Sequence, residues 1–323
     1  MQLGEMVAVA FIKEELEECP FTQEIVDSGV SEVDPEDIEN DYKKAARKEQ
    51  ENNGGTLGNN LSKGQPGSKG TVGGPYPPDG YLKTDQPLDS KPDRGQHYAY
   101  VEGADEYPDD KYPYVVAAHH LIPGKASLAP SKLKSFMTEG ESVKTESGKS
   151  WKIACHIGYN VNGAHNGIWL PGNYAIREPT KSWYKSPDAS KKWSELGDHP
   201  WCINYVASTS KVTQRQFHDT HKKYNKAAKK LLNKIATKLY AHQDKCEECA
   251  KKMNGEITPP YFIKQRLYNI SNYLHCQLTG SPSTWKRPWY ASDRWCDKVY
   301  SPASGRMDSA FLDAYDSARS VNK

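Results

Sequence analysis

Hydrophobic residues follow two patterns along this chain, short continuous runs near its middle and a helical stripe further on. The runs at residues 114–118 and 167–170 are followed by turns that contain proline and glycine, which predicts two buried strands. From about Ser210, apolar and aromatic positions recur every three or four residues as far as Leu239, which predicts one amphipathic helix. Thr209 and Ser210 are its expected N-cap residues.

Amino-acid composition divides the chain into three regions. Only 36% of the 323 residues are hydrophobic, and 24 glycines and 21 prolines indicate that part of the chain is loop. Residues 1–50 carry 14 acidic and 5 basic side chains, and residues 51–95 are rich in glycine and proline. We therefore expect an acidic docking or leader segment over 1–50, a flexible linker over 51–95, and a functional domain over 96–323.

Charge indicates the kind of partner this domain meets. Residues 151–323 carry 27 basic and 14 acidic side chains, which favours binding to a polyanion, although a solvated lysine-rich face is the simpler alternative. No run approaches the roughly 18 apolar residues of a membrane span. Residues 6–12 lack the basic start of a signal peptide. We expect neither membrane insertion nor a cleavable signal.

Seven cysteines, an odd number widely scattered, indicate a reducing compartment rather than a disulfide framework. Cys246 and Cys249 have the spacing of half a structural zinc site. A cysteine pair at this spacing is more often two ordinary helix residues. The ligands that would complete a site lie elsewhere in the sequence: Cys276, Cys296, His242 and His275.

Histidines at three places suggest a metal site. His119 and His120 end the first strand, and adjacent residues on a strand point to opposite faces, so the two have different roles unless the strand ends there. His218 and His221 are three apart on the predicted helix and can present two nitrogens to one metal, with His119 as third ligand. His120 is then free to act as a general base, with Asn166 orienting its ring.

Phosphodiester hydrolysis is a reaction that such a site can perform. It requires an activated water, a cation beside the phosphoryl and leaving oxygens, and positive charge along the backbone. Three histidines suit zinc or another transition ion, and magnesium, which keeps most of its waters, also fits. The expected phosphate contacts are basic residues near the helix start: Lys211, Arg215, Lys222 and Lys223.

These motifs together resemble a known family. His-His followed by Ile-Pro, then Asn-Gly-Ile-Trp-Leu-Pro, then His-x-x-His-x-x-Tyr is similar to the AHH branch of the HNH nuclease superfamily, over residues 115–240. The resemblance implies an α+β fold, a ββα-metal core with added helices. It also implies that His119, His218 and His221 bind metal, that His120 is the base, and that Asn166 is the family's asparagine. Between residues 166 and 218 the chain is longer than this core, so we expect an inserted loop rich in tryptophan and lysine.

The resemblance further implies a biological role. Nucleases of this branch are toxins of competing bacteria, made in the bacterial cytoplasm and delivered into the target cell by a secretion apparatus. On that basis we expect non-specific cleavage of DNA, a cognate immunity protein, and an adaptor or secretion contact through the N-terminal region. Two alternatives remain, a ribonuclease toxin of the same fold and a non-catalytic binding module stabilised by zinc at Cys246 and Cys249.

Overall fold

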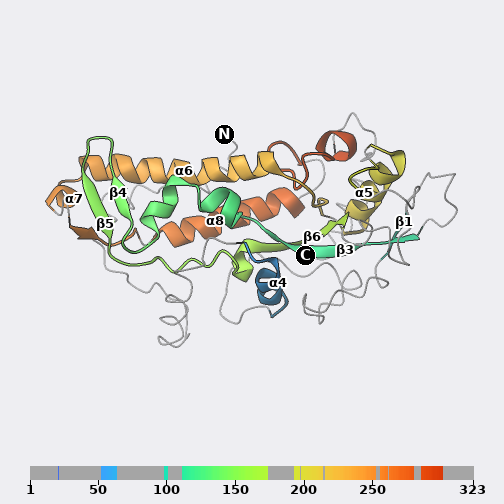
Figure 1. Cartoon of the computed structure of the whole chain (residues 1–323), viewed down its shortest axis with the longest axis horizontal. Helices are drawn as coiled ribbons and strands as arrows, with labels where there is room; N and C mark the ends of the chain where they lie inside the picture. The colour runs from blue at the N-terminus through green and yellow to red at the C-terminus, as the bar shows by residue number, and fades with distance from the viewer. Residues whose placement is uncertain are drawn as a thin grey trace.

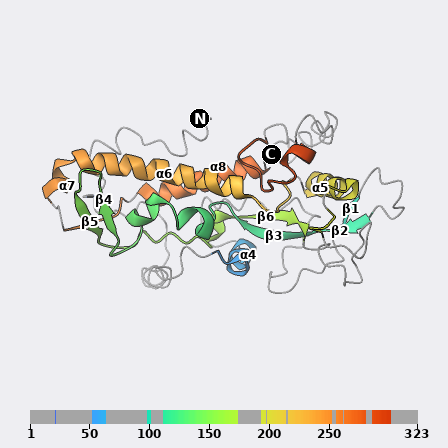
Figure 2. The same cartoon turned by 45° about the horizontal axis from the view of Figure 1, so that its top comes forward.

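The protein mixes helices and strands, as an α+β fold requires (Figure 1). Helices α6 (Lys222–Lys245) and α8 (Phe262–Thr279) run side by side along an elongated molecule (Figures 1 and 2). The computed structural model describes residues 21, 52–63, 98–100, 111–173, 193–196, 198–213, 215–251, 255–260, 262–279 and 285–300. The acidic segment apart from residue 21, the linker from residue 64 and residues 174–192 of the expected insertion lie outside these ranges.

Strands β3 (Val115–His120) and β6 (Gly167–Gly172) form an antiparallel pair at the centre of the fold. Both predicted strands are confirmed, and each extends two residues beyond its predicted end. The register places His119 opposite Ile168 and His120 opposite Gly167. Both histidines therefore belong to the ladder, and strand geometry directs their side chains to opposite faces.

Strand β6 separates two hydrophobic cores. All six of its residues are buried, which agrees with its continuous apolar sequence. Ile168 and Leu170 pack into the core that contains residues of α6 and α8. Trp169, on the opposite face, packs into a second core with residues of α4 (Gly54–Lys63) and α5 (Pro200–Thr213). Because side chains alternate between the two faces of β6, this one strand contributes to both hydrophobic cores.

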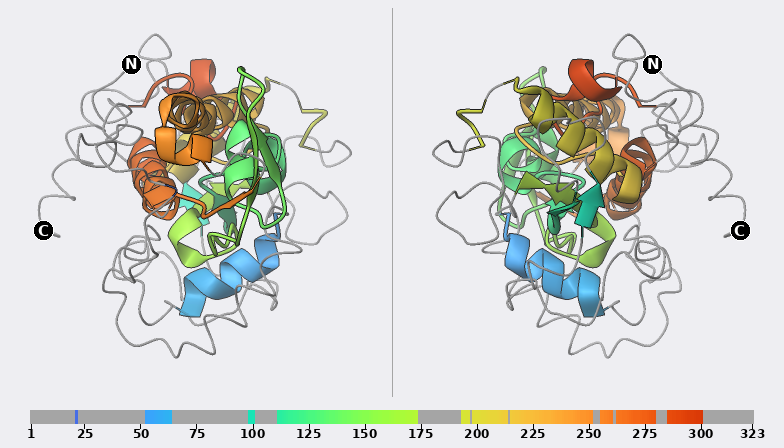
Figure 3. Two further views of the ribbon diagram at one scale, coloured as in Figure 1. Left: turned by 90° about the vertical axis from the view of Figure 1, so that its left-hand side faces the viewer. Right: turned by 90° about the vertical axis from the view of Figure 1, so that its right-hand side faces the viewer.

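Helix α4 corrects the expectation of a flexible linker for residues 54–63. Asn53 caps this helix, because its side-chain oxygen accepts a hydrogen bond from Thr56 N at 2.9 Å. Leu57 and Leu61, one helical turn apart, are buried in the second core beneath β3 and β6. The helix lies across the strand pair on the side away from α6 (Figures 1 and 3). The stabilisation gained by burying two leucines outweighs the low helix-forming tendency of this glycine-rich, otherwise polar sequence.

The predicted helix is divided in two by a non-helical segment. Thr209 and Ser210 lie inside α5 rather than at an N-cap, so that expectation is wrong; the Thr209 hydroxyl donates to Tyr205 O at 2.6 Å. Helix α6 begins only at Lys222. Its apolar stripe is confirmed, because residues at the predicted spacing are buried from Tyr224 to Leu239.

Smaller elements surround this centre. Two ladders are β1–β2 and β4–β5–β7, formed by Tyr98–Tyr100, Lys111–Pro113, Ser142–Lys144, Ser150–Ile153 and Glu256–Ile257. Short helical segments are α7 (Glu247–Lys251), Gly124–Leu128, Lys132–Phe136, Ala164–Asn166 and Cys296–Tyr300. The tryptophans at 285, 289 and 295 are buried, which confirms core packing. Within the described ranges, no helix has the length and apolar character to cross a membrane.

The close approach of α4 to β6 generates a stability prediction. A Cβ at Gly167 would lie 2.7 Å from Leu57 Cδ1 and 2.9 Å from Leu61 Cδ1, and both leucines are buried. Gly167→Ala should therefore lower the free energy of unfolding by about 1–3 kcal/mol in chemical denaturation. Gly54→Ala is the matched control, because nothing lies within 4 Å of its added Cβ. Equal stability of both variants would contradict this packing.

Candidate metal and catalytic site

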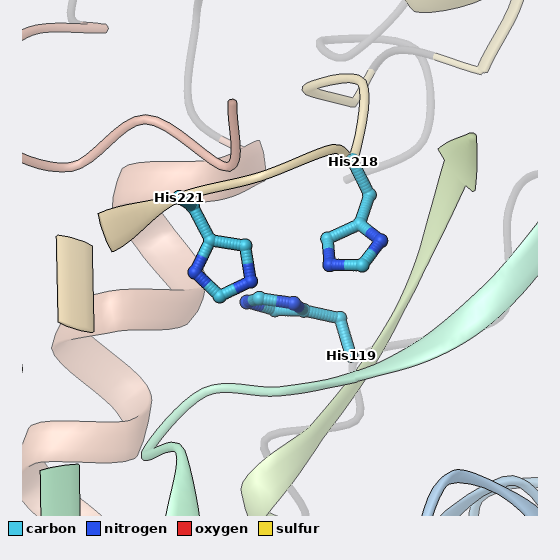
Figure 4. A group of neighbouring side chains, drawn as sticks. All are labelled: His119, His218 and His221. Carbon is cyan, nitrogen blue, oxygen red and sulfur yellow. The ribbon is translucent and has the colours of Figure 1, made fainter. Parts of the chain in front are cut away.

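Three histidines converge beside the strand pair. His119 lies on β3, His218 forms an isolated bridge with Gly172 at the end of β6, and His221 directly precedes α6. One ring nitrogen from each lies within 4.8 Å of the others. The ring centroids of His119 and His218 are 4.8 Å apart, and those of His119 and His221 are 4.9 Å apart. Figure 4 shows the three rings turned toward one another.

The two later histidines are not on a helix, contrary to expectation. The backbone N–H of His218 donates to Pro171 O at 2.6 Å, which attaches this residue to the end of β6. His221 is the N-cap of α6, with φ −137° and ψ 55°. The histidines nevertheless meet His119 as predicted, because the bridge and the helix start hold a short segment over β3.

Further hydrogen bonds fix this segment in place. The backbone N–H of Asp293 donates to Thr220 O at 2.7 Å, between the two histidines. The buried hydroxyl of Tyr224, in the first turn of α6, donates to Leu121 O at 2.6 Å. Leu121 directly follows the paired histidines of β3, so this bond joins the helix start to the strand end. The arrangement of the three histidines is therefore fixed by hydrogen bonds at the end of β3 and at the start of α6.

Burial keeps these histidines neutral. It lowers the pKa of His119 well below the usual range, and the neighbouring His218 and His221 lower it further. Burial lowers the pKa of His218 to about 3, with an added effect of His221, and burial also lowers the pKa of His221. A neutral imidazole has a free lone pair, which is the form that binds a metal ion.

The donor set fits one divalent cation. The Nε2 atom of His119 is buried and makes no hydrogen bond, as expected of a nitrogen that serves a cation. Within the described part of the chain, no further histidine, cysteine or carboxylate joins the group. Three nitrogens leave coordination positions open for water and substrate, which is the arrangement of a catalytic rather than a closed structural site.

His120, the next residue of β3, has different partners. Its side chain is buried, and its Nε2 lies 2.8 Å from Oδ1 of Asn162. Burial lowers the pKa of His120, and the Asn162 hydrogen bond opposes this effect. At neutral pH the ring is therefore uncharged and able to accept a proton. Asn162 was not predicted, because nothing in a segment with asparagines at 160, 162 and 166 distinguishes which one meets the ring.

Asn166, expected to orient the His120 ring, instead joins two loops. Its Oδ1 accepts from Ile122 N at 2.7 Å, and its Nδ2 donates to Ile122 O at 2.9 Å and Val161 O at 2.8 Å. Ser271 of α8 donates to the same Oδ1 at 3.2 Å. These bonds use the full capacity of the amide, so Asn166 supports the strand ends that carry the histidines.

The expected phosphate contacts differ in position. Lys222 and Lys223 are exposed in the first turn of α6, next to His221. Arg215 is buried, and its Nη1 donates to Trp169 O at 3.1 Å, so its guanidinium takes part in packing. Lys211 lies in α5, and its side chain is outside the described residues.

The cysteine pair forms a local contact. Cys246 is the C-cap of α6, and Cys249 is buried in α7 with its backbone nitrogen 3.5 Å from Cys246 Sγ. Neither cysteine forms a disulfide. Among described residues, no third ligand gathers with them into a metal-binding group. The two cysteines are therefore ordinary residues of neighbouring helix ends, the interpretation that the sequence also favoured over a zinc site.

Comparison with known protein families gives a match over about half of the chain. A family model, described as a nuclease family of the HNH/ENDO VII superfamily with conserved AHH, matches residues 101–270. This range includes both central strands, all three converging histidines and His120. No curated protein and no solved structure matches the chain.

The histidine cluster predicts one cation per chain. Zinc at about 100 times its Kd should raise the free energy of unfolding of metal-stripped protein by about 2.7 kcal/mol, measured by chemical denaturation. His119→Ala and His218→Ala should abolish this gain and the binding heat in calorimetry. His156→Ala is the matched control, since His156 pairs with Glu139 outside the cluster. Undiminished zinc binding by His119→Ala would refute the assignment.

Proposed function

Because the chain belongs to the AHH nuclease family of the HNH/ENDO VII superfamily, it is a nuclease, and we propose that it is a metal-dependent endonuclease. Its core would be the ββα-metal unit of β3, β6 and α6. The observation that carries this proposal is the convergence of His119, His218 and His221 beside a buried, neutral His120. Three ligands and an adjacent base are the components that water-dependent phosphodiester cleavage needs.

The residues divide the reaction between them. His120 accepts a proton from water through a ring nitrogen, and the oxygen of that water forms the new bond to phosphorus while the bond to the 3′-oxygen breaks. A divalent cation bound by the three histidines would neutralise charge on the phosphoryl and leaving oxygens. Lys222 and Lys223, exposed beside His221, hold the flanking phosphates.

DNA is the substrate that we propose. Lysine contacts with phosphate carry no base information, which supports cleavage without sequence preference. The basic character of residues 151–323 supports a polyanionic substrate. The same contacts suit RNA, so both polymers need to be tested as substrates.

The proposal predicts metal-dependent cleavage of supercoiled plasmid. Wild-type protein should nick and linearise it with zinc or magnesium, and EDTA should stop the reaction. His120→Ala should lower kcat by about 10²–10⁴-fold, the usual contribution of a general base, while retaining zinc binding. His156→Ala should cut at the wild-type rate. Cleavage of structured RNA but not plasmid would replace DNA with RNA. Intact nucleic acid under every divalent ion tested would reject the enzyme.

We also propose that the protein is a toxin used in competition between bacteria. Its secretion contact would lie in the N-terminal region, and an immunity protein would protect the producing cell. This role rests on the family resemblance, since a non-specific DNA nuclease harms any cell in which it acts.

The toxin proposal predicts growth arrest when the chain is expressed in a bacterial cytoplasm. Induction of wild-type protein should fragment the host chromosome and stop colony formation. His120→Ala, expressed to the same soluble level, should restore growth, because arrest requires the chemical step. Normal growth with active, soluble wild-type protein would contradict the role but leave the nuclease assignment intact.

A further inference from the structure

Helix α4 reaches the catalytic region although it lies outside the matched residues 101–270. The backbone N–H of Asn53, its N-cap, donates to Oδ1 of Asn162 at 2.9 Å. The Nδ2 of Asn60 donates to the backbone carbonyl of Asn162 at 2.8 Å. The same Oδ1 of Asn162 lies 2.8 Å from Nε2 of His120. A continuous set of hydrogen bonds thus connects α4 to the proposed base.

This connection determines which nitrogen of His120 carries a proton. A backbone N–H can only donate, so the amide atom of Asn162 that faces Asn53 must be the oxygen. A carbonyl oxygen can only accept, so Nε2 of His120 must donate to it. A neutral imidazole has one N–H, which leaves Nδ1 with the lone pair. The amide orientation and the ring tautomer therefore both follow from one N–H of the polypeptide backbone.

We propose that Asn162, held by α4, is a positioning residue that fixes His120 in the Nε2–H form and presents Nδ1 to the attacking water. The inference rests on the proposed function, because it takes His120 to be the base. It assigns a role to a segment that precedes the matched region, so that residues 52–63 complete the site.

Packing gives α4 the rigidity that this role requires. The side chains of Leu57 and Leu61 pack closely against Gly167, the residue paired with His120 in the strand register. Oδ1 of Asn52 accepts from Gly124 N at 2.6 Å, beyond the end of β3. Helix α4 and the residues directly before it therefore contact the loop after β3 and the loop before β6, and Asn162 lies in the second.

Substitution at Asn162 tests the inference in the full-length chain. Asn162→Ala removes the acceptor and should lower kcat about 10-fold or more, within the ~10²–10⁴-fold contribution of a general base, with KM nearly unchanged. Asn162→Asp keeps an acceptor oxygen and should recover most of that loss. A folded Asn162→Ala variant with wild-type kcat would overturn the inference, and so would a failure of Asn162→Asp to exceed Asn162→Ala.

A pair of substitutions on α4 tests the contribution of the helix. Asn60→Ala removes the donor to the Asn162 carbonyl and should lower kcat several-fold without changing zinc binding. Thr56→Ala is the matched control, because Thr56 is exposed on the same helix, and it should cut at the wild-type rate. Equal kcat for the two variants would show that α4 does not influence the base, and would overturn the role proposed for this helix.

The ring tautomer can be measured without any cleavage. Nitrogen NMR of ¹⁵N-histidine-labelled full-length protein distinguishes Nε2–H from Nδ1–H, and His120→Gln identifies the signal. Wild-type His120 should be Nε2–H, and Asn162→Ala should shift it toward a mixture; an Nδ1–H wild type would overturn the inference. If wild-type protein cleaves no nucleic acid, the proposed function fails, whereas this measurement still decides the Asn162 contact.

Discussion

The antiparallel register of β3 with β6 is the constraint on which the rest of the site depends. Alternation along β3 gives two adjacent histidines different surroundings, the cluster of three histidines for His119 and Asn162 for His120. A slip of one residue would exchange these surroundings. The register is well specified because β6 is buried on both faces, and a slip would force Trp169 into space shaped for Ile168 and Leu170. Core packing thereby decides which histidine joins the histidine cluster and which faces Asn162.

The site also depends on burying three imidazoles together. Burial lowers the pKa of each ring, and neighbouring histidines lower the pKa of His119 and His218 further, so protons compete weakly with a cation for the ring nitrogens. A buried nitrogen without a hydrogen bond, such as Nε2 of His119, is costly in an apolar surrounding. A bound cation compensates that cost, so metal binding and fold stability are coupled at this point.

Sequence patterns predicted the elements that short-range physics controls. The two strands follow from apolar runs closed by turns, and three of the four candidate histidines converge as their spacing and the family resemblance indicate. The pattern failed where tertiary contacts overrule local preference. His218 and His221 have the three-residue spacing of one helix face, yet the bridge of His218 to Gly172 delays the helix until Lys222.

The missed elements share one cause, which is that their role arises from partners distant in the sequence. Helix α4 has a glycine-rich start, and only its contact with strands more than 50 residues away explains why it is ordered. Asn162 is separated by 42 residues from His120 and by 109 from Asn53. No local pattern encodes such contacts, so composition alone suggested a linker there.

The position of Asn162 in a loop explains why a helix is needed beside it. A side chain on a loop is held only as precisely as its hydrogen bonds and packing allow, whereas an N-cap is fixed by the helix that it begins. Asn53 combines both properties, since its side chain caps α4 while its N–H holds the Asn162 oxygen. Local opening of α4 would release that oxygen and with it the tautomer preference of His120. The stability of a ten-residue helix is thereby linked to the geometry of His120.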